Sequence, residues 1–210
     1  MTEQRRRRGP RGDISAEDLL VAAEHVLRSG GPGGLSLRSV ARRADVTPTV
    51  LYTYFDDMAD LRNRLGDDFL GRLDLTLLRS FAPREALRRF LHHLLAVFHD
   101  SPGHVALLAS QRVIGPHALA LNEALLGFFV EVVGHTPERA AALTMFATEW
   151  VHGRLLLWPS NPVTEGFTRA MSRIDPAQFP RTTASLSASV EDEGVELLVS
   201  AAVPEPSGSG

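Results

Sequence analysis

The 210-residue chain contains no cysteine, and it also lacks the long apolar runs of membrane proteins. Without cysteine it can form neither a disulfide framework nor a thiolate metal site, which fits a cytoplasmic setting. No run of about 18 uninterrupted apolar residues is present, so a membrane-spanning helix is not expected. The N-terminal stretch MTEQRRRRGPRG is charged and has no apolar segment of the kind found in secretory signals. The chain is therefore predicted to be cytoplasmic, with no membrane among its partners.

Strand-like patterns are missing as well, because apolar and polar residues do not alternate over stretches long enough to build a sheet. The sequence is 44% hydrophobic and 22% charged, which suits compact domains with a sizeable core. Apolar residues recur at helical spacing up to about residue 158, with proline and glycine between one helix and the next. A weaker helix up to about residue 174, a mobile loop over 175–189 and a last helix over 190–203 are expected to follow. The predicted fold class is all-α.

Positive charge is concentrated at the N-terminus, although the formal net charge of the chain is -3. Such a segment is either a solvated, disordered tail or a basic arm that contacts DNA phosphates or a minor groove. Its composition leaves both interpretations open, and the residues that follow must decide between them. The arginines concerned are Arg5, Arg6, Arg7, Arg8 and Arg11.

Local signals predict three helices in about 45 residues after this arm. Ser15 has the pattern of a capping-box N-cap, and the glycine-rich stretch 29–34 ends the first helix. Ser36 and Thr47 are the predicted N-caps of two short helices. Between them Asp45 lies at a sharp turn, where aspartate tolerates the left-handed conformation. A short, tightly joined pair is typical of a helix-turn-helix, whose second helix lies in the DNA major groove.

The only two tyrosines of the chain, Tyr52 and Tyr54, lie in the second helix of this pair. Advancing about 100° per residue from Pro48 places Tyr54 and Phe55 on the packed side of the helix. Tyr52 falls at the middle of the exposed side. The spacing therefore predicts that Tyr52 faces DNA while the ring of Tyr54 packs against the protein.

The segment GGLSLRSVARRADVTPTVLYTYFDDMADL, Gly33 to Leu61, resembles the DNA-binding head of the TetR (tetracycline repressor-type) family. The resemblance covers about residues 14–65, and beyond them only the layout of the family is similar. The residues in register with the family pattern are Val40, Ala41, Val46, Thr47, Leu51, Tyr52, Tyr54, Phe55 and Leu61. Two positions depart from it: Asp45 replaces the usual glycine, and Met58 replaces a lysine that binds phosphate in many members.

The resemblance implies a role for each residue of the head. Ser36 and Arg38 would contact phosphate, and Arg38 would also be able to reach a base. Thr53 and Tyr54 would hold phosphates at the edges of the reading surface, and the arginine arm would compensate for the missing lysine. The reading surface itself would consist of Thr47, Pro48, Thr49 and Tyr52.

The resemblance also implies a ligand-responsive transcriptional regulator, most often a repressor, that binds a palindromic double-stranded DNA operator as a homodimer. It would bind a small-molecule effector and need no cofactor or metal. A long helix at about 137–158 and a short final helix at about 190–203 are the candidates for the dimer interface. The expected domains are a basic arm over 1–13, a DNA-binding domain over 14–60, an effector-binding and dimerisation domain over 61–203, and a tail over 204–210.

Aromatic and polar residues of the larger domain are the candidates for lining the effector pocket. Such a lining suits an apolar or aromatic ligand. The same rings could instead fill the core of a helical bundle. The candidates are Phe90, His93, Phe98, Gln111, His117, Phe128, Phe146, Trp150, His152 and Arg154.

Two alternatives come from other classes of protein. Glu149 and His152 form one Glu-x-x-His pair, which is half of the ligand set of a di-iron helical bundle. The second pair that such a metalloenzyme needs is not found in the sequence, so an enzyme is not expected. An architectural DNA-binding protein without an effector would not need more than 100 residues of helical body after the head.

Overall fold

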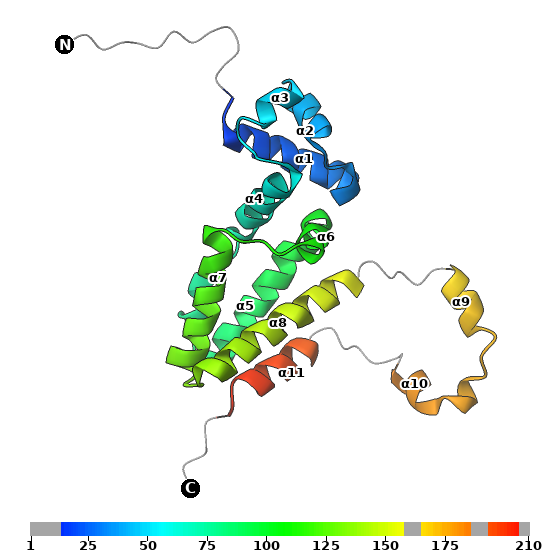
Figure 1. The fold of residues 1–210 in the computed structure, drawn as a ribbon. Helices are drawn as coiled ribbons and strands as arrows, with labels where there is room; N and C mark the ends of the chain where they lie inside the picture. Colours follow the sequence, from blue (N-terminus) through cyan, green and yellow to red (C-terminus); the bar gives the residue numbers. More distant parts are fainter. Residues whose placement is uncertain (1–13, 158–164, 186–192, 206–210) are drawn as a thin grey trace, which may run out of the picture. The chain divides into compact units, whose positions relative to one another are not determined.

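The structure is a computed structural model that describes residues 14–157, 165–185 and 193–205. Every regular element of these residues is helical, which confirms the all-α prediction (Figure 1). No helix of the described residues is long and apolar enough to cross a membrane. The chain divides into two compact units, one formed by residues 1–72 with 101–119 and the other by residues 73–100 with 120–210.

The first unit contains the predicted DNA-binding head and one helix that comes from later in the chain. Its core joins buried side chains of α1, α2, α3 and α4 with Leu107 of α6, and α1 packs against both α2 and α6. The elements are α1 (Ala16–Gly34), α2 (Leu37–Arg43), α3 (Pro48–Leu51), α4 (Met58–Leu70), α6 (Pro102–Ser110) and the first residues of α7 (Pro116–Gly127).

Helix α1 begins where the sequence predicts, but its helical residues run to Gly34, through the glycine-rich stretch that was expected to end it. The Ser15 hydroxyl accepts a hydrogen bond from the Asp18 N–H at 3.1 Å, and the Asp18 carboxylate accepts one from the Ser15 N–H at 2.9 Å. These bonds from Ser15 hold the pKa of Asp18 below its ordinary value. Regular helical geometry is broken at Gly31, whose φ of 62° and ψ of -174° suit only glycine. A last helical turn continues through Pro32 to Gly34.

The second unit is built around α5 (Pro83–His99), which packs against α8 (Pro137–Leu157) and α11 (Glu193–Ala202) (Figure 1). Arg88 of α5 forms two hydrogen bonds to the Glu196 carboxylate of α11, and this guanidinium lowers the pKa of Glu196. The remaining elements are the 3-10 helices η1 (Leu75–Leu78) and η3 (Pro176–Gln178), the π-helical turn η2 (Phe128–Val132), α9 (Glu165–Met171) and α10 (Pro180–Ser185).

Helix α4 is shorter than predicted. The spacing of apolar residues in the sequence predicts one helix over about 58–79, whereas α4 ends at Leu70 and Gly71 is its C-cap. The short helix η1 follows, with the Asp74 carboxylate accepting a hydrogen bond from the Thr76 N–H at 3.0 Å. Asp74 thus caps a new helix, η1, in a stretch where the spacing of apolar residues alone predicted one continuous helix.

The segment predicted as a mobile loop contains two helical elements, which corrects that prediction. Asp175 caps η3, and α10 spans Pro180–Ser185. No residue of η3 or α10 is buried, so apolar periodicity could not reveal them. The predicted helix end at about residue 158 and the predicted start of the last helix at residue 190 lie outside the described residues.

Helix α4 binds the loop that leads into α7 through two side chains one turn apart. Asn63 pairs with the Ile114 backbone: its amide donates to the Ile114 carbonyl at 2.7 Å, and its carbonyl accepts from the Ile114 N–H at 2.9 Å. The buried Asp67 carboxylate accepts from the Ala118 N–H at 2.8 Å and the His117 N–H at 3.4 Å. Asp67 therefore acts as an N-cap for α7, supplied by a different helix.

Candidate nucleic-acid interface

The turn between α2 and α3 has the geometry predicted for a helix-turn-helix. Asp45 adopts the left-handed conformation with φ 55°, and the Val46 N–H donates to the Ala41 carbonyl at 2.9 Å. Thr47 is the N-cap of α3, but its hydroxyl makes no capping hydrogen bond. Pro48 occupies the first turn, where its missing N–H costs nothing.

Helix α3 ends at Leu51, so Tyr52 and Tyr54 follow the helix rather than lie in it, but burial separates the two tyrosines as the spacing predicts. Leu51 and Phe55 are 0% and 1% exposed, and they fasten this segment to the core of the head. The Tyr52 side chain is 61% exposed on the opposite side. Tyr54 is half-buried, and its hydroxyl donates to the Ile14 carbonyl at 2.5 Å. The predicted phosphate contact of Tyr54 stays a prediction, and it would require this hydroxyl proton to change partner.

The other residues predicted to contact DNA lie on the outside of the head. The Ser36 hydroxyl is the N-cap of α2, because it accepts from the Ser39 N–H at 3.1 Å. The reading-surface assignment stays a prediction, but the exposure that it needs is present. Exposed side chains are those of Ser36, Arg38, Thr47, Pro48, Thr49, Tyr52 and Thr53. The predicted DNA arm, Arg5, Arg6, Arg7, Arg8 and Arg11, lies outside the described residues.

Met58 has a structural role that the sequence did not reveal. Met58 is half-buried and packs against the core cluster of the head, so this position contributes apolar contact in place of the family's lysine. The Asp57 carboxylate accepts from the Asp60 N–H at 2.8 Å and caps α4. Its negative charge therefore lies at the positive end of a helix, where it is stabilising.

A buried histidine, also missed by the sequence reasoning, links α6 to α1 within the first unit. His104 is 1% exposed and stacks on Phe69 with ring centroids 4.1 Å apart. Its Nε2 lies 2.8 Å from a Glu24 carboxylate oxygen, at ion-pair distance but without the alignment of a good hydrogen bond. Arg72 and Arg28 also contact this carboxylate, each at 3.2 Å. Burial lowers the pKa of His104, and the Glu24 charge opposes that shift.

The predicted effector-binding residues are divided between the two units. Gln111 and His117 belong to the first unit, and the other eight belong to the second. Phe90, Phe98 and Phe128 are at most 3% exposed and fill the core of the second unit.

The remaining candidates of the second unit have varied surroundings. The His93 Nε2 accepts from the Asp74 N–H at 3.0 Å, and the Phe146 side chain is 51% exposed. Arg154 lies over the ring of Trp150, 6.0 Å from its centroid, and the His152 Nδ1 lies 2.8 Å from the Thr148 carbonyl oxygen. The effector set as a whole stays a prediction.

The pair considered for a metalloenzyme, Glu149 and His152, lies on α8 with Glu149 exposed. Across the part of the chain that the structure describes, no group of three or more histidine, aspartate or glutamate side chains is placed to hold a metal ion. The geometry at this pair therefore offers no support for a metal centre.

Comparison with known sequences supports the same kind of DNA-binding head as the geometry does. The profile of the bacterial regulatory proteins of the tetR family matches residues 19–65. An HTH-type transcriptional regulator of Saccharopolyspora erythraea is 27% identical over 110 residues, which are 52% of this chain and 47% of that protein. The chain thus spans about half the length of the curated relative that it matches.

Solved structures share the fold over almost the whole chain. The Streptomyces coelicolor TetR family protein ActR in complex with (S)-DNPA has a TM-score of 0.79 at 16% identity, covering 91% of this chain and 98% of that one. ActR in complex with actinorhodin has a TM-score of 0.72 at 17% identity, covering 90% and 96%. At these identities the likeness concerns the fold. Residues 19–65 match the tetR family of bacterial regulatory proteins, and the whole chain shares the fold of TetR family structures.

Proposed function

We propose that the chain is a homodimeric, ligand-responsive transcriptional repressor that binds a palindromic operator in the cytoplasm. The observation that carries this proposal is the two-sided segment made of α3 and the turn that follows it, up to Phe55. Leu51 and Phe55 anchor it in the core, while Tyr52, beside Thr47 and Thr49, presents a polar surface to solvent. Such a surface, on the second helix of a helix-turn-helix, is suited to reading base edges in the major groove.

The homodimer is supported by apolar side chains exposed on α8 and α11, the two helices predicted for the interface. Exposed apolar patches of this kind mark protein–protein contacts. A twofold-symmetric dimer that binds a palindrome needs its two reading helices about one DNA turn, roughly 34 Å, apart. The exposed residues are Met145, Phe146, Leu156, Leu157 and Leu197.

A small-molecule effector is supported by the likeness in fold to ActR, which is known in complex with actinorhodin. We infer an apolar or aromatic effector for this chain from the phenylalanine and tryptophan residues of its second unit. Effector and operator would then weaken each other's binding by the same coupling free energy, typically about 1–3 kcal/mol. The catalytic alternative is not favoured, because Glu149 and His152 have no companion ligands among the described residues.

The test is selection of a random duplex library on the purified full-length protein, followed by binding of the selected site across a salt series. A palindrome with half-sites about one turn apart, bound by two protomers, is the expected result. Weak binding without sequence preference would contradict the proposal. The selected duplex then allows effectors to be screened, since the correct class releases the protein from the site.

A further inference from the structure

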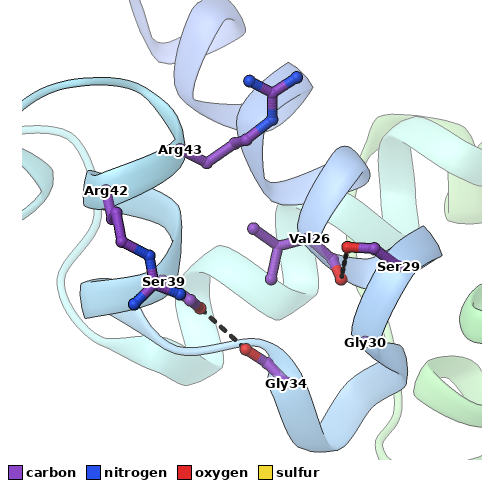
Figure 2. A pocket seen from close by; sticks show the side chains of 7 residues that line it. All are labelled: Val26, Ser29, Gly30, Gly34, Ser39, Arg42 and Arg43. Atoms are coloured by element: carbon purple, nitrogen blue, oxygen red, sulfur yellow. Dashed lines mark hydrogen bonds between the residues drawn. The ribbon is translucent and has the colours of Figure 1, made fainter.

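The proposed function assigns no role to a pocket in the DNA-binding head, between α1 and α2. It has a volume of about 420 Å³, which is within the range of sites for small molecules. Figure 2 shows the two sides of this pocket, which come from different helices. Val26, Ser29 and Gly30 of α1 line one side, and Ser39, Arg42 and Arg43 of α2 line the other.

The glycine-rich end of α1 leaves bare backbone at this pocket. A Cβ atom added at Gly30, or at Gly34, which also lines the pocket, would meet no protein atom within 4 Å. Close packing therefore does not explain glycine at these two positions. Glycine also allows a ligand to approach the backbone closely.

The charge of the pocket is positive. The residues that line it include two arginines and no carboxylate, and both arginines are exposed. Among the described residues, neither Arg42 nor Arg43 has a carboxylate within ion-pair distance. Guanidinium groups bind phosphate through paired N–H donors, so two of them on one wall favour an anion.

The two hydroxyl groups of the pocket are held in place by the protein itself. The Ser39 hydroxyl donates to the Gly34 carbonyl at 2.8 Å, and the Ser29 hydroxyl donates to the His25 carbonyl at 2.9 Å (Figure 2 shows the first of these bonds). The Ser39 bond ties α2 to the end of α1 and so keeps the two walls at a fixed separation. Donors for a ligand therefore come from the arginines.

We propose that this pocket binds a phosphate group through Arg42 and Arg43, with Val26 contacting the organic part that carries the phosphate. None of the residues of the predicted reading surface lines the pocket. The phosphate can belong to a small molecule or to the DNA backbone. The first case is independent of the proposed function, whereas the second rests on it.

The small-molecule case is tested by titrating phenyl phosphate into the full-length protein, without DNA and at constant ionic strength. Saturable binding is expected for the wild type. The double variant Arg42→Ala/Arg43→Ala should bind at least tenfold more weakly with an unchanged unfolding temperature, because both side chains are exposed. Arg112→Ala is the control, since Arg112 is an exposed arginine of the same unit outside the pocket, and it should bind like the wild type.

The DNA case is tested with the same three proteins on the selected operator. If the phosphate is that of DNA, phenyl phosphate does not bind and the double variant lowers the log–log salt slope by about 0.9 for each lost phosphate contact. A wild type that binds phenyl phosphate but no DNA would refute the proposed function and leave the pocket assignment standing. The assignment is overturned if the double variant equals Arg112→Ala in both assays, or if the wild type binds phenyl phosphate and the double variant binds it with the same affinity.

Discussion

At the residue scale, two neighbouring glycines of α1 are expected to respond in opposite ways to the same substitution. Gly30 lies in a regular part of the helix with open space around its Cβ position. Gly31 has φ 62° and ψ -174°, a conformation that other residues adopt only with strain. Gly30→Ala should stabilise the protein by about 0.4–1 kcal/mol, and Gly31→Ala should destabilise it by about 1–3 kcal/mol. Urea unfolding of both variants checks this, and equal effects would show that the kink at Gly31 does not exist in solution.

The two tyrosines allow a base-reading role to be separated from a structural one. Tyr52→Ala removes an exposed ring and should weaken binding to the selected operator by about 1–3 kcal/mol, with a smaller loss on random DNA. Tyr54→Phe removes the hydrogen bond to Ile14 and should cost about 1 kcal/mol of folding stability while preserving sequence preference. Anisotropy titrations on both duplexes provide the measurement. Unchanged discrimination in Tyr52→Ala would remove Tyr52 from the reading surface.

At the element scale, α7 is expected to depend on a carboxylate of α4. Asp67→Ala leaves the half-buried Ala118 N–H without its acceptor, which should cost about 1–3 kcal/mol of stability. Hydrogen exchange should become faster at Ala118 before it changes elsewhere. Asp68 is exposed on the same helix, and Asp68→Ala is the matched control. The same exchange rates at Ala118 in both variants would contradict the capping role.

The contact between α1 and α6 predicts how stability changes with pH. Burial holds the pKa of His104 below the value of 6.5 that it has when unfolded, although Glu24 opposes the shift and Arg72 and Arg28 reinforce it. Below pH 6.5 the unfolded chain therefore takes up a proton that the folded chain does not, so stability falls with decreasing pH until His104 is itself protonated. His104→Gln should flatten the dependence of the unfolding free energy between pH 7.5 and 5. His25→Gln, at an exposed position of α1, should leave it unchanged.

The elements that the sequence predicted correctly are those fixed by local chemistry. The capping box at Ser15 and the left-handed turn at Asp45 depend on neighbours within a few residues, and both are confirmed. The exposure of Tyr52 follows from helical spacing alone. What was missed depends on contacts between distant segments. Packing of Met58 against the head and the assignment of α6 to the first unit are examples, because no local pattern encodes them.

At the scale of the whole molecule, assembly is expected to depend on the apolar face of α8. Phe146→Glu places a charge on a side chain that is 51% exposed in the isolated chain and that we propose to be covered in the dimer. Sedimentation should show a dimer for the wild type and a monomer for this variant, with affinity for the palindrome lost accordingly. Ala96→Glu, at an exposed position of α5, is the control and should remain dimeric. A dimeric Phe146→Glu protein would place the interface elsewhere.

The sequence defined the architecture of the whole molecule less completely than that of the head. The family pattern extended over about residues 14–65, and the rest was predicted from helix count and order alone. Bundles conserve apolar spacing while individual side chains change, which is why fold likeness to ActR persists at 16% identity. The effector set stays unresolved for the same reason, because Phe90 and Phe128 satisfy the requirements of a core and of a pocket lining equally well.

The hydrogen bonds of Asn63 and Asp67 also restrict how the chain can vary in length. Surface loops usually accept inserted or deleted residues. Here the N–H groups of Ile114 and Ala118 must reach Asn63 and Asp67, which are four positions apart on α4. Gly115 lies in the chain between Ile114 and Ala118. A side chain at Gly115 would come within 2.3 Å of the Asp67 carboxyl carbon. The connection between α6 and α7 is therefore fixed in both length and composition, and insertions in this part of the surface should be absent from proteins that keep Asn63 and Asp67.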